Sequence, residues 1–556
     1  MGLCCVQMEI RRIQSFLFQE PYLAAMVGSN VLIGEFLRFE LPALHRNYWQ
    51  EQTLPESSAP RVARPVVAGD PLAESEDDPN ASYAKGILVK DAGRFWALLD
   101  QDDAAEFIRR AESLESGQLL KEQLSWRVIN LDESSSGFGN VVHQLTPRPD
   151  GARLPSSLPF LAQDTQGDAL IFAEVNKPEP GIRQHKRDRF RARAAQDIAS
   201  LLVASMDVRP APDDLESLAA GDYLAVVQLD GNSIGARVTE IKGGEQPAPT
   251  TLHDWLQVQA RTESFFWMMR RLMRAATAGA CRQVFGATNQ PGQHSVAPYQ
   301  LLMLGGDDLL LVCRAKQALD FVIAFSRVLK RCSQEGLDID PCAAQNSLMT
   351  KTPLSVSVGV MIAKHSVPFA KLQYAASQLC SSAKVTARSM NGATSSVVDW
   401  AVTTQNWVDD PVAARRTHDC MVLGDSIHLL TRRPYLVDSS DALMGLDRLL
   451  EAARHMSSLL PDPAKDERAS RIARSQLKGL REKLASQDGL SMLAWLETPP
   501  ALRKTIADLR IGVTRSSPWC TLPELHGVPT LHATRLLDLI EIMEIETLGH
   551  QPARSV

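Results

Sequence analysis

The spacing of apolar residues predicts that the first half of the chain alternates between strands and helices. An apolar run at residues 3–9 indicates a strand, and an apolar period of 3.6 residues over about 30–44 predicts a helix. The apolar runs 86–89 and 94–99 are separated by a short polar turn and are typical of a β-hairpin. A further helix is expected at about 103–114.

The second half repeats this pattern more clearly. It opens on an apolar strand at 223–229, which ends at Asp230 and is followed by a long helical region. The strands 299–304 and 309–313 then flank the turn Gly305-Gly306-Asp307-Asp308. A helix, a strand, a helix and a last strand follow at about 315–333, 354–363, 368–388 and 396–400. The order β-α-β-β-α-β-α-β predicts a ferredoxin-like core with extensions, within the α+β class.

Four segments are expected from these patterns. They are a first ferredoxin-like domain at 1–175, a basic helix and linker at 176–218, a second ferredoxin-like domain at 219–402, and a mostly helical C-terminal domain at 403–556. The basic helix, at 183–206, clusters six cations: Arg183, Lys186, Arg187, Arg189, Arg191 and Arg193. A solvated helix face and a contact with phosphate or RNA both explain such a cluster.

Composition narrows the classes of function. The net charge of the 556-residue chain is -6, so any contact with nucleic acid must come from local basic patches. Its nine cysteines include no Cys-x-x-Cys pair, which argues for a reducing compartment and against a structural zinc site. A signal-peptide pattern and long apolar runs are missing, so we expect a cytoplasmic protein without a membrane segment.

The turn Gly305-Gly306-Asp307-Asp308 carries the strongest chemical signal. It lies between two apolar strands, where carboxylates are costly unless another charge compensates them. Mg²⁺, or Mn²⁺, is the natural compensation because it prefers carboxylate and phosphate oxygens. The first strand lies beside this hairpin in the expected sheet and adds a third acid. The predicted catalytic metal ligands, for a two-metal nucleotidyl transfer, are Asp230, Asp307 and Asp308.

Several neighbouring positions are candidates for substrate binding. Glycines at the turn leave room for a large substrate, and those before the next helix offer backbone N–H groups to a triphosphate. Lys384 could reach a substrate phosphate, although a solvent-facing lysine is also compatible with its position. The full set of candidates is Gly231, Gly235, Gly305, Gly306, Ser357 and Lys384.

The second half resembles the large palm-containing subunit of type III CRISPR effector complexes, especially its III-B form. Leu229-Asp230-Gly231-Asn232-Ser233-Ile234-Gly235 is similar to that family's first metal-binding strand end. Leu304-Gly305-Gly306-Asp307-Asp308-Leu309 is similar to its cyclase signature. The strand at Ser357-Val358-Gly359-Val360 and the helix with Ala383-Lys384 resemble the segments that follow.

The first half fits the same family. Ile13-Gln14-Ser15-Phe16 and Gly28-Ser29 resemble the opening of its first, non-catalytic palm. Lys90-Asp91-Ala92-Gly93 would be the degenerate counterpart of the Gly-Gly-Asp-Asp turn. The resemblance implies two ferredoxin-like palm domains, of which the second is catalytic, plus a C-terminal helical domain.

The resemblance also implies a function. It implies a Mg²⁺-dependent nucleotidyltransferase of antiviral defence that makes cyclic oligoadenylate from ATP when target RNA is recognised. The implied partners are CRISPR effector subunits with crRNA and target RNA. Carried over by position, Asp230, Asp307 and Asp308 would hold the metals and Lys384 would contact the triphosphate.

Three features depart from the family pattern. The chain begins directly at the first palm, without the His-Asp nuclease domain of many relatives, so we expect no DNase activity. The zinc-binding cysteines common in relatives are also absent. Asn232 stands where relatives often carry a second aspartate, and a neutral amide there weakens one possible metal contact.

Two other functions remain open at this point. The first is a non-catalytic scaffold subunit whose helices bind RNA or a neighbouring subunit. The second is a diguanylate-cyclase-like enzyme, because the palm core and the Gly-Gly-Asp turn are shared. ATP and GTP, offered as sole substrates, would separate the two enzymes.

Overall fold

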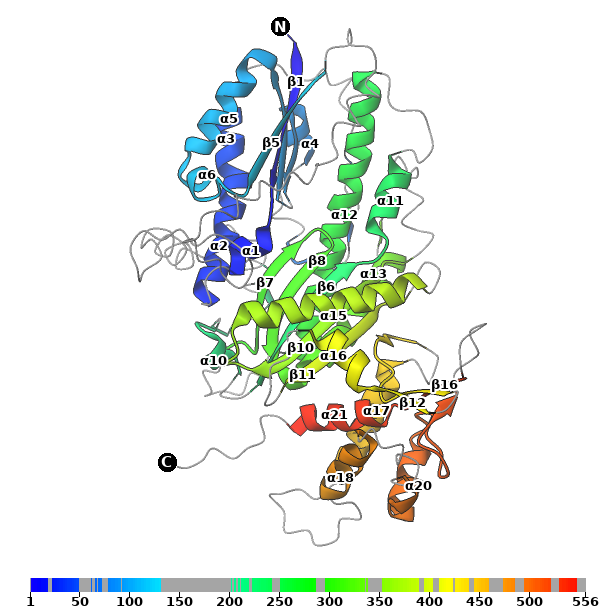
Figure 1. The fold of residues 1–556 in the computed structure, drawn as a ribbon. Helices are drawn as coiled ribbons and strands as arrows, with labels where there is room; N and C mark the ends of the chain where they lie inside the picture. The colour runs from blue at the N-terminus through cyan, green and yellow to red at the C-terminus, as the bar shows by residue number, and fades with distance from the viewer. Residues whose placement is uncertain are drawn as a thin grey trace, which may run out of the picture.

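The structure is a computed structural model of the chain, drawn as a ribbon in Figure 1. It describes residues 2–18, 23–49, 79–131, 209–242, 251–286, 296–338, 353–389, 395–403, 410–459, 474–485, 495–521 and 530–547, with short gaps inside some ranges and isolated positions near 62–72 and 202–206. The predicted basic cluster from Arg183 to Arg193 lies outside the described residues. The four domain boundaries therefore stay predictions.

The N-terminal part contains a four-stranded antiparallel sheet with the order β3-β4-β1-β5. Its strands are β1 (Leu3–Ile10), β3 (Ile87–Asp91), β4 (Arg94–Asp100) and β5 (Leu124–Asn130). The predicted first strand and hairpin are confirmed. The helices that cover one face are α2 (Leu23–Glu35), α3 (Leu41–His45) and α5 (Ala104–Ser113), with a π-helical turn at Phe36–Glu40 between the first two.

The middle of the chain contains a six-stranded sheet with the order β14-β11-β10-β6-β8-β7. Its strands are β6 (Tyr223–Gly231), β7 (Tyr299–Gly305), β8 (Asp308–Arg314), β10 (Val356–Lys364), β11 (Val397–Thr403) and β14 (Tyr435–Leu436). In both sheets the central strands run fourth, first, third, second in chain order. The two sheets therefore share one ferredoxin-like topology, as predicted.

Each sheet and the helices packed on it form one unit, and helices hold the two units together. The helices α12 (Leu252–Val284) and α13 (Ala318–Glu335) pack on one face of the second sheet, and α15 (Phe369–Ser389) crosses the other (Figure 1). The N-terminal end of α12 also inserts Trp255 and Leu256 against the first sheet. On the α15 side, the rings of Phe18 and Phe369 lie 5.3 Å apart. The shared apolar cores fix the position of the first unit on the second.

The C-terminal part is less purely helical than predicted. Its helices are α16 (Pro411–His418), α17 (Leu446–Ser458), α18 (Arg474–Ala485), α20 (Pro500–Asp508) and α21 (Leu536–Thr547). A small sheet joins β12 (Cys420–Leu423), β13 (Ser426–Leu429), β16 (Thr530–Ala533) and β15 (Cys520–Thr521). Strands of two to four residues are too short to show a period in the sequence. Among the described helices, none has the length and apolar character needed to cross a bilayer.

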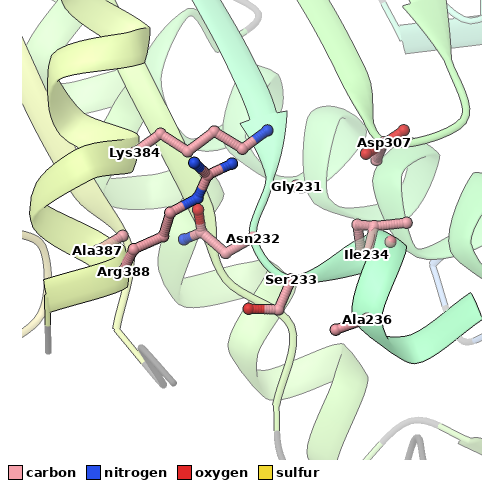
Figure 2. A pocket seen from close by; sticks show the side chains of 10 residues that line it. Gly231, Asn232, Ser233, Ile234, Ala236, Asp307, Lys384, Ala387 and Arg388 are labelled. Atoms are coloured by element: carbon pink, nitrogen blue, oxygen red, sulfur yellow. The ribbon is translucent and has the colours of Figure 1, made fainter. Parts of the chain in front are cut away.

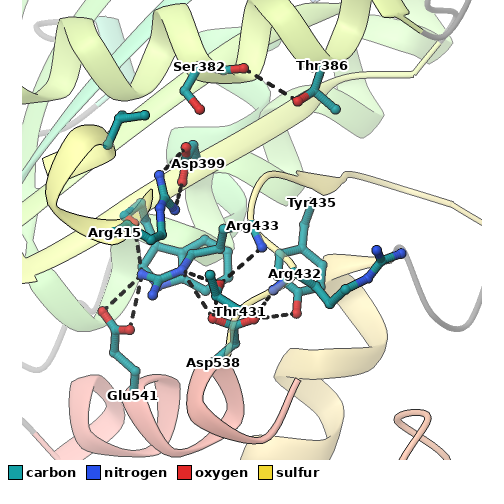
Figure 3. A network of polar contacts seen from close by, with 12 residues as sticks. Ser382, Thr386, Asp399, Arg415, Thr431, Arg432, Arg433, Tyr435, Asp538 and Glu541 are labelled. Carbon is teal, nitrogen blue, oxygen red and sulfur yellow. Dashed lines mark hydrogen bonds and ion pairs between the residues drawn. The ribbon is translucent and has the colours of Figure 1, made fainter. Parts of the chain in front are cut away.

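A buried polar network attaches this C-terminal part to the second sheet (Figure 3). Asp399 of β11 is fully buried and accepts two hydrogen bonds from the Arg415 guanidinium, at 2.5 and 2.6 Å. Arg433 lies beside them, donates to the backbone oxygen of Trp400, and forms ion pairs with Asp538 and Glu541 of α21. Removal of one partner would leave a buried charge without its counter-ion. The network therefore favours a single geometry for the contact between the C-terminal part and the second sheet.

The strand β10 and the helix α15 pack very closely at Gly359. A β-carbon at this position would lie 2.0 Å from the Ala376 backbone oxygen and 2.4 Å from the Cys380 nitrogen. The backbone of α15 therefore rests directly on the strand, which brings the side chains of its C-terminal half to the edge of the sheet.

We expect Gly359→Ala to destabilise the protein by about 1–3 kcal/mol, because the added methyl group must push α15 away from the sheet. Thermal unfolding followed by circular dichroism measures the effect. Gly479→Ala is the matched control: Gly479 lies in α18 with open space around it, so alanine should leave the melting temperature unchanged or slightly higher. Equal melting temperatures for Gly359→Ala and wild type would contradict this account of the packing.

Candidate active site

The sheet register brings the predicted acids together. Leu229 of β6 pairs with Leu309 of β8, so one further step along the two antiparallel strands places Asp230 opposite Asp308. Opposite residues of neighbouring antiparallel strands project from the same face with their β-carbons about 5 Å apart. Two carboxylates thus meet at one edge of the sheet, where the central strands end.

The third acid, Asp307, lies in the hairpin between β7 and β8. Gly305 pairs with Asp308, so Gly306 and Asp307 form a two-residue turn. Gly306 has a φ of +61°, a conformation that glycine adopts without strain and that two-residue hairpins require at this position. A β-carbon added to Gly231 would lie 2.8 Å from the Asp307 β-carbon. The glycine after Asp230 therefore makes room for Asp307 beside the first strand.

Asp230, Asp307 and Asp308 form a compact cluster. Each offers one carboxylate oxygen, and these oxygens all lie within 4.8 Å of one another. In the described part of the chain this is the one group of three or more acidic, histidine or cysteine side chains close enough to share a metal ion. An all-carboxylate donor set fits a hard divalent cation such as Mg²⁺ or Mn²⁺.

The electrostatics of the cluster show why it needs a cation. Burial, and then the negative charge of Asp307 and Asp230, raises the pKa of Asp308 from 3.8 to about 7. Burial and the charge of Asp230 likewise raise the pKa of Asp307. Without a metal, protonation is one way to relieve the repulsion; a divalent cation would relieve it with all three groups ionised.

The positive charge of Lys384 compensates part of the negative charge of the three acids. Its ammonium group lies 2.5 Å from the Asp230 carboxylate, at the edge of the site. Lys384 comes from the C-terminal half of α15, which the close contact at Gly359 holds against the sheet. The structure thus brings Lys384 to the predicted acids, where it forms an ion pair with one of them.

A cavity of about 390 Å³ opens next to the cluster (Figure 2). Figure 2 shows Lys384 and Arg388 reaching from α15 across the loop after β6, with Asp307 on the far side. The first residues of α11 (Ile234–Ile241) form another wall, and the Ser233 side chain makes no capping hydrogen bond to them. Amide groups at a helix N-terminus and two cations make this cavity suited to a phosphate group.

The remaining predicted residues fall into two groups. Gly235 lines the cavity, and β-carbons at Gly235, Gly305 and Gly306 would meet no other atom within 4 Å, so these glycines border open space. Ser357, by contrast, lies away from the cavity lining. Its side chain is fully buried and its hydroxyl donates to Asn232 at 2.6 Å, so in this structure it supports the loop after β6.

Arg388 is the residue that the sequence predictions missed. It lies four positions after Lys384 on the same helix, and residues at this spacing share one helix face. That spacing was the signal available in the sequence. The side chain is exposed at the mouth of the cavity.

The same edge of the first sheet carries different chemistry. Glu9 of β1 pairs with Arg94, the first residue of β4, where the second sheet has Asp230 opposite Asp308. One acid is thus replaced by a cation, and no acidic cluster lies at this edge within the described residues. The expectation of a degenerate first unit agrees with this pairing.

Comparisons with known proteins place the second unit in a family. Residues 223–391, under a third of the chain, match the family model described as Cas10/Cmr2, second palm domain. A search of curated proteins finds no match.

Several solved structures are similar to the chain at low sequence identity. Csm1 from T. onnurineus has 13% identity and a TM-score of 0.45, over 98% of this chain and 69% of that one. A Csm1–Csm4 cassette with pppApA has 12% identity and a TM-score of 0.48, over 98% and 69%. The cassette with AMPPNP has 11% identity and a TM-score of 0.37, over 71% of this chain and 54% of that one.

The family model covers β6, the hairpin and α15, which are the elements that carry the acidic cluster and Lys384. Residues 223–391 of this chain are a second palm domain of the Cas10/Cmr2 family.

Proposed function

We propose that the chain is a divalent-metal-dependent nucleotidyltransferase of a type III CRISPR system, which makes cyclic oligoadenylate from ATP when its effector complex binds target RNA. The observation that carries the proposal is the cluster of three carboxylates beside a cationic cavity, within a Cas10/Cmr2 palm domain. Its partners on this proposal are the other effector subunits, crRNA and target RNA.

One group of residues would bind the metal ions and another would bind the substrate. Asp230, Asp307 and Asp308 would hold two Mg²⁺ ions, which supply charge neutralisation at the reacting phosphate and activation of the attacking 3′-hydroxyl. The cavity receives the β- and γ-phosphates of the donor nucleotide. There the N–H groups at the start of α11 and the cations of Lys384 and Arg388 bind the anionic oxygens.

The reaction that this arrangement supports is an in-line displacement at the α-phosphate. The 3′-oxygen of one nucleotide forms a bond to the α-phosphorus of the next, and the bond to the leaving pyrophosphate breaks. The chain contributes mainly by orientation, because it holds the triphosphate in a cavity beside the acids. Lys384 and Arg388 stabilise the negative charge that builds up on the pyrophosphate.

Replacing both turn acids should abolish synthesis. In Asp307→Ala/Asp308→Ala, a single carboxylate remains, so oligonucleotide formation should fall at least about a thousandfold. The measurement is mass spectrometry of products after incubation of the full chain with Mg²⁺ and ATP or GTP, with and without effector subunits and target RNA. Undiminished product from the double variant would overturn the assignment of the site. Product from GTP alone would favour a diguanylate-cyclase-like enzyme, and none from either nucleotide would favour a scaffold.

The raised pKa of Asp308 predicts how stability depends on pH. Its proton is bound more tightly in the folded protein, so its stabilising effect is complete below about pH 4 and is lost as pH rises through 7. In EDTA, Asp308→Asn should therefore melt above wild type by a smaller margin at pH 5 than at pH 8. Calorimetry measures both melting temperatures.

Addition of Mg²⁺ provides the control for this comparison. It should raise the melting temperature of wild type at pH 8 by more than that of Asp308→Asn, because the cation replaces the proton as compensation. The same difference in melting temperature at pH 5 and pH 8 in EDTA would contradict the electrostatic account.

Arg388 should contribute to nucleotide affinity without affecting the metal ligands. Arg388→Ala removes one cation from the mouth of the cavity, and we expect its dissociation constant for AMPPNP with Mg²⁺ to rise about tenfold. Titration calorimetry measures this constant. Arg331→Ala is the matched control, since this exposed arginine lies on α13, across the sheet from α15. Equal affinity in both variants would exclude Arg388 from the phosphate site.

A further inference from the structure

The loop between β6 and α11 is fastened to the start of β10 through Asn232. The Asn232 backbone N–H donates to the Ser355 carbonyl oxygen at 2.9 Å. Its side-chain amide donates to the Ser355 hydroxyl at 3.0 Å and accepts a hydrogen bond from the Ser357 hydroxyl at 2.6 Å. All three side chains are buried. Both ends of the amide are therefore engaged, one by Ser357 of β10 and the other by Ser355 just before that strand.

This loop has a conformation that needs such support. Ser233, the next residue, has a φ of +60°, in the left-handed region that costs a residue with a side chain about 1–2 kcal/mol. A strained residue persists only where its surroundings hold it in place. The hydrogen bonds of Asn232 provide this restraint from the residue immediately before it.

The restrained loop sets the position of two functional groups at once. It starts at Asn232, two positions after Asp230, and it ends at Ile234, where the first residues of α11 line the cavity. The distance between the metal cluster and the phosphate-binding helix end is therefore determined by three residues, Gly231, Asn232 and Ser233. A displacement of about 1 Å in such a substrate-positioning element can cost a large factor in binding or rate.

We infer that Asn232 is a positioning residue for nucleotide binding and is not a metal ligand. The inference rests on the proposed function, because it assigns a task at the same site. Asn232 lines the cavity, but its oxygen accepts from Ser357 and its amide group donates to Ser355, so both ends of the side chain are occupied by these serines. Asn232 thus holds the start of α11 at the right distance from the acids, and Ser355 and Ser357 hold Asn232.

The experiment compares metal and nucleotide affinity in the full chain. In Asn232→Ala, Mn²⁺ binding without nucleotide, measured by electron paramagnetic resonance, should stay within about twofold of wild type, because the three carboxylates remain. The dissociation constant for AMPPNP with Mg²⁺, from titration calorimetry, should rise about tenfold, because the helix end is no longer held. Parallel losses of both affinities would overturn the inference in favour of a metal ligand.

Further variants separate positioning from general destabilisation. Ser355→Ala should weaken AMPPNP binding, and the double variant Asn232→Ala/Ser355→Ala should be no weaker than Asn232→Ala, because both remove the same contact. Ser29→Ala is the matched control: it removes an equally buried hydroxyl, bonded to Ala25 within α2, and should leave AMPPNP affinity unchanged.

The remaining outcomes separate a failure of this inference from a failure of the proposed function. AMPPNP affinity that is unchanged in Asn232→Ala would overturn the inference alone, while the proposed function stands. Failure of wild type to bind AMPPNP would overturn the proposed function together with this inference. A Ser29→Ala loss as large as that of Asn232→Ala would reduce the role of Asn232 to overall stability.

Discussion

The mutual repulsion of three half-buried carboxylates is the constraint around which the second palm is organised. Asp230, Asp307 and Asp308 come close enough to share a cation, and burial raises the pKa of the two turn residues. Such a cluster costs stability unless protons, an ammonium group or metal ions compensate it. The surrounding structure is best understood as what keeps these groups together despite this cost.

Strand pairing, a tight turn, apolar burial and one close helix contact hold the three carboxylates together despite this repulsion. The β6–β8 pairing fixes Asp230 opposite Asp308, and the tight turn at Gly306 points Asp307 back toward the first strand. The apolar faces of these strands are buried against helices on both sides, so the register cannot slip without exposing them. The close contact at Gly359 then seats α15, which carries the cations.

Much of this arrangement was predictable from the sequence, because it depends on local patterns. Apolar strands around a Gly-Gly-Asp-Asp turn indicate the hairpin, and the element order indicates which strand lies beside it. The contacts of Ser357 were not predictable, since a serine in an apolar strand gives no sign of the side chain that it meets 125 residues away. The small C-terminal sheet was missed for a related reason: it pairs short strands from distant parts of the chain.

The position of Lys384 suggests how metal and substrate binding are linked in the proposed enzyme. Its ammonium group is bound to Asp230, one of the three groups that a metal must contact. A divalent cation held by the acids would compete with Lys384 for that carboxylate, and Lys384 also lines the cavity proposed to take the triphosphate. On the proposed function, the same lysine would compensate the acids before metals bind and would supply a phosphate-binding cation afterwards. Since the released lysine favours the triphosphate, metal binding and nucleotide binding should strengthen each other.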